Sequence, residues 1–182
     1  TTTFNIDGKE YTPLHYAISH YGGTEEVKAV LSAAKDHSDD LLKEMLTTTF
    51  NIDGTEYTPL HFAIIYGYVR TEIVKALLAA AKDHSDGLLK EMLTTTFKDD
   101  GKEYTPLGWA MKKYDTELVQ ALLTAAKDQP ALVKEMLTTT FKEYGKECTP
   151  LHCAIHYKRQ NPVKALLTAA KDHSDDLLQE ML

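Results

Sequence analysis

Cysteine and histidine are the side chains of this sequence that could hold a metal ion. Cys148, His152 and Cys153 lie close together, and zinc binds sulfur and nitrogen ligands of this kind. A structural zinc site needs four ligands, and no second Cys-x-x-Cys or His pair with the usual spacing completes the set. We therefore interpret Cys148 and Cys153 as small buried hydrophobic residues, and we expect no metal site.

A second histidine pattern, Asp-His-Ser-Asp, contains His37, His84 and His173 and could indicate a cation site. The corresponding stretch before Pro130 lacks the histidine, so a polar turn that caps a helix is the better interpretation. The sequence has no glycine-rich phosphate loop, no nucleophile elbow and no His-Glu-x-x-His motif. We therefore expect no catalytic residues, no cofactor and no enzymatic activity.

The bulk composition excludes further classes of protein. The 182 residues carry a net charge of −7, whereas binding to nucleic acid or to an anionic membrane needs a basic surface. No apolar run approaches the roughly 18 residues of a membrane-spanning helix. The two cysteines do not form a disulfide framework, which favours a reducing, cytoplasmic compartment. The first residue, Thr1, is not a methionine, which indicates a piece of a longer protein.

The chain repeats itself along its whole length. The sequence Thr-Thr-Thr-Phe begins at Thr1, Thr47, Thr94 and Thr138. Each copy closes with Glu-Met-Leu, so the boundaries give repeat 1 (1–46), repeat 2 (47–93), repeat 3 (94–137) and repeat 4 (138–182). A regular repeat of this kind predicts one array over residues 1–182, in which stacked repeats share a core.

Each repeat is expected to contain a hairpin turn and three short helices. In repeat 1 the Asp-Gly pair at 7–8 predicts the hairpin, and Ser38 predicts the start of the third helix. Thr12 is expected to cap the first helix and Pro13 to begin it, where a missing N–H costs nothing. Caps of the second helices are predicted at Thr24, Thr71, Thr116 and Asn161.

The sequence Thr-Pro-Leu-His-x-Ala at residues 12–17, 58–63 and 149–154 resembles the hallmark of ankyrin repeats. Repeat 3 departs from it, with Gly108 in place of the histidine. The resemblance implies an all-α solenoid of four stacked repeats, and it implies that His15, His61 and His152 are structural residues that bond backbone between neighbouring repeats. An ankyrin unit is about 33 residues long, so the third helix makes this a lengthened variant. A bacterial effector-like protein, acting in the host-cell cytosol, and an engineered array are both compatible with it.

Two positions near the end of the first helix vary between repeats, whereas the second and third helices barely change. The variable residues are Ser19, His20, Ile65, Tyr66, Lys112, Lys113, His156 and Tyr157. In the resembled family these positions and the hairpin tips, here Lys9, Thr55, Lys102 and Lys146, lie on the concave face and contact partners. Drift at exposed positions is the alternative explanation.

The function expected from the resemblance is a non-enzymatic scaffold that binds another protein. The lysines in an acidic chain favour an acidic or mixed-charge partner segment with an apolar anchor, and neither nucleic acid nor a membrane is expected. We expect a monomer. The sequence leaves open whether such arrays stack end to end. Two alternatives remain at this stage: a spacer between flanking domains, and the binding module of a larger enzyme or effector.

Overall fold

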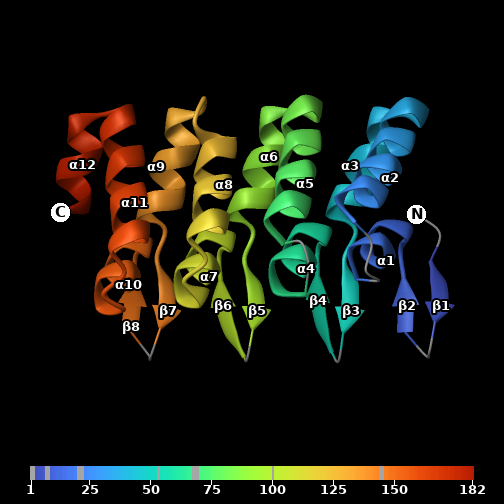
Figure 1. Cartoon of the computed structure of the whole chain (residues 1–182), viewed down its shortest axis with the longest axis horizontal. Coiled ribbons are helices and arrows are strands. Elements are labelled where there is room, and N and C mark those ends of the chain that lie inside the picture. Colours follow the sequence, from blue (N-terminus) through green and yellow to red (C-terminus); the bar gives the residue numbers. More distant parts are fainter. Residues whose placement is uncertain are drawn as a thin grey trace. The chain divides into compact units, whose positions relative to one another are not determined.

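A computed structural model of the chain describes residues 3–6, 9–19, 23–52, 54–66, 70–99, 101–143 and 146–182. The chain divides into two compact units, Thr1–Met92 and Leu93–Leu182, which we call the N-terminal and the C-terminal unit. Each unit holds two of the predicted repeats, and each is described by itself below (Figure 1). The single array predicted over residues 1–182 remains a prediction.

The elements of the N-terminal unit follow the order expected for two repeats. They are β1 (Phe4–Ile6), β2 (Lys9–Tyr11), α1 (Pro13–Ser19), α2 (Thr24–His37), α3 (Asp39–Thr47), β3 (Phe50–Ile52), β4 (Thr55–Tyr57), α4 (Pro59–Tyr66), α5 (Arg70–His84) and α6 (Asp86–Thr94). Both strand pairs are antiparallel hairpins in the same register, which places Phe4 opposite Tyr11 and Phe50 opposite Tyr57.

The C-terminal unit repeats this order. Its elements are β5 (Phe97–Asp99), β6 (Lys102–Tyr104), α7 (Pro106–Lys113), α8 (Thr116–Ala126), α9 (Pro130–Thr138), β7 (Phe141–Glu143), β8 (Lys146–Cys148), α10 (Pro150–His156), α11 (Gln160–His173) and α12 (Asp175–Met181). Phe97 pairs with Tyr104 and Phe141 with Cys148. The prediction of a hairpin and three helices in each repeat is therefore confirmed.

The first helices begin where the sequence predicts. The Thr12 hydroxyl accepts a hydrogen bond from the backbone N–H of His15 at 3.2 Å, and this satisfies one donor of the first turn. The same bond recurs from His61 to Thr58, from Gly108 to Thr105 and from His152 to Thr149. Because proline follows each threonine, the start of the helix is fixed by two independent signals.

The predicted caps of the second helices are wrong. Helix α2 is preceded by Gly23 without a side-chain cap, and α11 is preceded by Arg159, also without one. In α8 the cap is Asp115, whose carboxylate accepts from the N–H of Leu118 at 3.0 Å. Thr24, Thr71, Thr116 and Asn161 already lie within the helices, and a capping residue needs a non-helical backbone. These helices therefore begin one or two residues before the expected places.

Packing between repeats buries the helices within each unit. In the N-terminal unit α1 contacts α4, and α5 lies against both α2 and α3. In the C-terminal unit α7 contacts α10, and α11 lies against both α8 and α9. Leu14, Leu60, Leu122 and Leu166 are fully buried at these contacts. In both units the hairpins lie to one side of the second and third helices (Figure 1).

The glycine of repeat 3 has a packing reason. In repeat 1 the ring of Phe50, from the hairpin of the next repeat, packs 5.1 Å from the His15 ring between centroids. In the C-terminal unit Phe141 takes the corresponding place, and a Cβ at Gly108 would lie 2.8 Å from its ring. Phe141 is itself buried, so its ring has little room to move. Gly108 therefore leaves room for the Phe141 ring, which lies closer to the helix than a Cβ at this position would allow.

Gly108→Ala is accordingly expected to destabilise the C-terminal unit. Overpacking costs about 1–3 kcal/mol, and the better helix propensity of alanine returns up to about 1 kcal/mol, so we expect a net loss of roughly 1 kcal/mol or more. Urea unfolding followed by the fluorescence of Trp109 measures it. The matched control is Gly87→Ala in α6, where a Cβ would meet nothing within 4 Å. A stabilised Gly108→Ala protein would contradict this packing reason for the glycine.

Candidate functional site

The histidines of the Thr-Pro-Leu-His motif differ in their surroundings. His15 is completely buried, and its Nδ1 lies 2.7 Å from the Thr12 hydroxyl. Burial lowers the pKa of His15 from 6.5 to about 4, although the backbone of Tyr57 in the next repeat partly raises it. Its Nε2 makes no hydrogen bond of standard geometry with the described residues. His15 is therefore a neutral structural residue, whereas His152 in repeat 4 is exposed.

Cys148, His152 and Cys153 are the possible metal ligands singled out from the sequence. Among the described residues, no group of three or more His, Cys, Asp or Glu side chains could hold a metal ion. Cys153 is buried and Cys148 half-buried, and neither forms a disulfide within the described residues. The interpretation of both as hydrophobic residues thus fits Cys153 better than Cys148.

Tyr66 is an exposed aromatic side chain at a variable first-helix position of the N-terminal unit. It is 46% exposed at the end of α4, and its ring packs against those of Phe62 and Tyr57 at centroid distances of 5.2 and 5.9 Å. Ile65 is half-buried, as is Ser19, whose hydroxyl donates to the Tyr16 carbonyl at 3.1 Å. His20 lies outside the described residues. Neighbouring rings therefore hold the Tyr66 ring in place while part of it is exposed to solvent.

The two lysines of α7 share one carboxylate. Asp99 accepts from Lys112 Nζ at 3.2 Å and from Trp109 Nε1 at 3.1 Å, and Lys113 Nζ lies 4.0 Å away. Lys112 Nζ also lies 4.4 Å from the centroid of the Tyr104 ring. Burial acts to lower the pKa of Lys112, but contacts with Tyr104 and Asp99 outweigh it, so its pKa is raised. Asp99 therefore neutralises one of the two lysine charges at the end of α7.

Between repeats 2 and 3 the residue at the position of Lys112 changes together with the residues around it. The positions of Asp99, Trp109 and Lys112 correspond in repeat 2 to Ile52, Phe62 and Ile65. An apolar trio has thus been exchanged for a hydrogen-bonded one, with the Asp99 side chain 17% exposed and that of Lys112 19% exposed. Part of the variation at the predicted face therefore has a structural cause within the repeat. Lys113, which is 44% exposed, is the better candidate for contact with a partner.

In repeat 4 the predicted residues join an aromatic cluster. His156 and Tyr157 pack edge to face, and Tyr157 packs in the same way on Tyr114, with ring centroids 5.2 Å apart. The guanidinium carbon of Arg159 lies 3.8 Å from the centroid of the Tyr114 ring. The structure thus brings Tyr157 together with two residues that the sequence analysis missed. Tyr114 directly follows α7 in repeat 3, and an exposed tyrosine beside the predicted lysines was the only signal for it.

The hairpin tips are less uniform than the sequence predicts. Lys146 is exposed, Thr55 and Lys102 are half-buried, and the side chain of Lys9 is outside the described structure. Between the two hairpins of the C-terminal unit lies a hollow of about 600 Å³. Its lining is mostly charged and consists of Thr96, Lys98, Gly101, Lys102, Glu103, Thr140, Phe141, Lys142 and Glu147. Lys98 faces Glu103 and Lys142 faces Glu147 across the strand pairs, so the charges of the hairpins are largely balanced.

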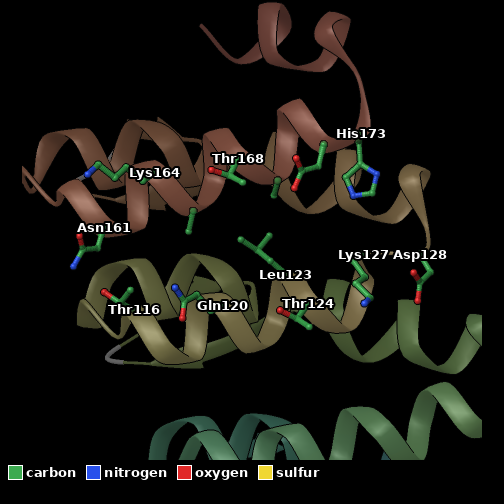
Figure 2. A pocket seen from close by; sticks show the side chains of 13 residues that line it. Thr116, Gln120, Leu123, Thr124, Lys127, Asp128, Asn161, Lys164, Thr168 and His173 are labelled. Atoms are coloured by element: carbon green, nitrogen blue, oxygen red, sulfur yellow. The ribbon is translucent and has the colours of Figure 1, made fainter.

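A second hollow of about 840 Å³ runs between α8 and α11 (Figure 2). Figure 2 shows Thr116, Gln120 and Thr124 along one wall and Lys164 and Thr168 along the other. In the N-terminal unit the corresponding helices, α2 and α5, are joined by an ion pair of 3.4 Å between Lys35 and Asp83. None of the residues predicted to contact a partner lines the hollow between α8 and α11.

Comparison with known families agrees with this architecture. A family described as ankyrin repeats, in three copies, matches residues 4–87 and 77–176. The chain therefore belongs to the ankyrin-repeat family. Searches of curated proteins and of solved structures found no match.

Ankyrin repeats are in general protein–protein interaction modules and typically not catalytic. None of the helices in the described parts of the chain is both long enough and apolar enough to cross a membrane.

Proposed function

We propose that the protein is a non-enzymatic scaffold that binds a partner protein through its first-helix face. This face consists of the variable ends of the first helices and the hairpin tips. Family membership supports a protein partner, and Cys148 and Cys153, which form no disulfide among the described residues, favour a reducing compartment such as the cytoplasm.

The observation that carries the proposal is the exposure of Tyr66. In α4 the residues from Pro59 to Ile64 are buried, whereas the aromatic ring of Tyr66 at the end of the helix is not. Contacts with Phe62 and Tyr57 restrict that ring before any partner arrives. A large aromatic side chain with few free torsions loses little entropy on binding, and tyrosine is enriched among the residues that dominate interface energies.

Charge supports an acidic or mixed-charge partner segment. Asp99, Lys112 and Lys113 together leave one net positive charge at the end of α7, in a chain whose net charge is −7. A positive site in acidic surroundings steers a complementary segment toward itself and excludes strongly basic ones. Lys113 rather than Lys112 serves this purpose, because Lys112 is already held by Asp99 at 3.2 Å.

The test is to isolate a saturable partner from lysate and then to measure its association rate with Lys113→Glu. We expect association to slow at low ionic strength and the difference to shrink as salt is added. The charge-matched control is Lys43→Glu on α3, whose exposed lysine lies on a third helix and should leave the rate nearly unchanged. If the protein were only a spacer between domains, no saturable partner would be isolated. Equal association rates for Lys113→Glu and Lys43→Glu would contradict the predicted electrostatic steering.

A further inference from the structure

Arg159 is held with its hydrogen-bonding edges available. Its guanidinium carbon lies 3.8 Å from the centroid of the Tyr114 ring, which is the distance of a stacked cation–π contact. The residue is exposed, and within the described residues no carboxylate forms an ion pair with it. Stacking uses one face of the planar guanidinium and leaves the N–H groups at its rim for a ligand.

Tyr114, the base of this stack, is itself fixed. Its backbone is left-handed, with φ 62°, and its N–H bonds to the Met111 carbonyl at 3.3 Å as the cap of α7. The ring of Tyr157 packs edge to face on it at 5.2 Å. Tyr114 nevertheless stays 39% exposed, so the arrangement is ordered without being closed to solvent.

The backbone at this place is strained in both repeats of the unit. Lys158, at the position of repeat 4 that corresponds to Tyr114, is also left-handed, with φ 56°. A left-handed backbone is unfavourable for a residue other than glycine, and repeat 2 has Gly67 at the corresponding place. Side chains kept at such positions against this cost are often functional. Here they supply the tyrosine under Arg159 and a second cation beside it.

Two carboxylates of repeat 3 make bonds to other groups. Asp115 follows Tyr114 and accepts a hydrogen bond from Leu118 N–H as the cap of α8. Asp99 is engaged with Lys112 and Trp109. The loops after α7 and α10 carry Lys158 and Arg159 against the single carboxylate of Asp115, which leaves one net positive charge in a protein of net charge −7.

We infer that Arg159, stacked on Tyr114 and flanked by Lys158, is a binding site for a carboxylate side chain of the partner. The inference rests on the proposed function, since it assumes a protein ligand, and it specifies an aspartate or glutamate within that ligand. The carboxylate would accept two parallel N–H bonds from the guanidinium, the geometry that arginine offers and lysine does not. Lys158 adds charge without fixed geometry.

The experiment is a double-mutant cycle with peptides selected on the whole protein. Random dodecapeptides displayed on phage are panned on the wild-type chain, and each acidic residue of the binders is changed to its amide. For at least one peptide we expect an amide change to weaken binding by about tenfold to the wild type and by much less to Arg159→Gln. Arg159→Lys should behave like Arg159→Gln, because the charge alone does not restore the paired bonds.

Tyr114→Gly is a second variant that separates ligand binding from folding. It removes the stacked ring but relieves the left-handed strain, so thermal stability should not fall while peptide affinity does. If no binders emerge, or if no acidic residue of any binder couples to Arg159, the carboxylate site is wrong. If Lys113→Glu slows a partner's association while Arg159→Lys has no effect on its affinity, the proposed function survives and only this site is lost.

Discussion

Acidification from about pH 7 to about pH 4 is expected to remove about 3 kcal/mol from the stability of the N-terminal unit through His15 alone. This histidine is fully buried, and burial lowers its pKa to about 4 in the folded chain. In the unfolded chain the pKa of a histidine is near 6.5, so the folded state binds fewer protons between these two values.

The direction of the effect follows from proton linkage. Below about pH 6.5 His15 binds a proton in the unfolded chain, whereas in the folded chain it binds one only near about pH 4. The free energy of unfolding therefore falls as the pH falls through this window. Above the window both states are neutral at His15, and the residue contributes no pH dependence.

Urea unfolding of wild type and His15→Gln across this range isolates the effect, since the amide does not titrate. The stability of the variant relative to wild type should improve by about 3 kcal/mol from neutral to acidic pH. His152→Gln is the matched control, because it makes the same replacement at the corresponding position of repeat 4, where the histidine is exposed. If the free energies of unfolding of wild type and His15→Gln depended on pH in the same way, His15 would be protonated within the fold and the prediction would be wrong.

The order of elements could be predicted because local signals agree with one another. Thr12 and Pro13 both specify the same helix start, and Ser38 caps the third helix through a bond from Leu41 N–H. The second helices were misplaced where several residues that can act as caps follow one another. Asp115 and Thr116 are adjacent, and only the backbone conformation decides which of them caps the helix.

The exposure of some candidate residues could be predicted from the sequence, but their contacts could not. Repeat variation pointed to Tyr66 and Lys113, whose exposure agrees with a surface role. The pairing of Lys112 with Asp99 depends on how the hairpin lies against α7, which sequence spacing does not specify. Arg159 and Tyr114 belong to different repeats and meet because of the loop after each first helix, so no local pattern could place them together.

Tyr66→Ala is expected to reduce affinity for the partner by about 2 kcal/mol or more, roughly a 30-fold rise in Kd. The reason is that Tyr66 offers an aromatic surface that the fold leaves 46% exposed and that neighbouring rings already hold in place. The same change should affect stability little, because the core is formed by other residues, such as the fully buried Leu60.

The measurement that tests the first-helix face most directly is therefore the Kd of one isolated partner for four forms of the whole chain. These are the wild type, Tyr66→Ala, Lys43→Ala and Lys90→Ala, with a thermal melt of each as a check on folding. Lys43 and Lys90 are exposed on the third helices α3 and α6, so their replacement should leave the Kd almost unchanged. The account predicts a large loss for Tyr66→Ala only. A loss for the two third-helix variants with full affinity retained by Tyr66→Ala would place the binding surface on the opposite elements and contradict it.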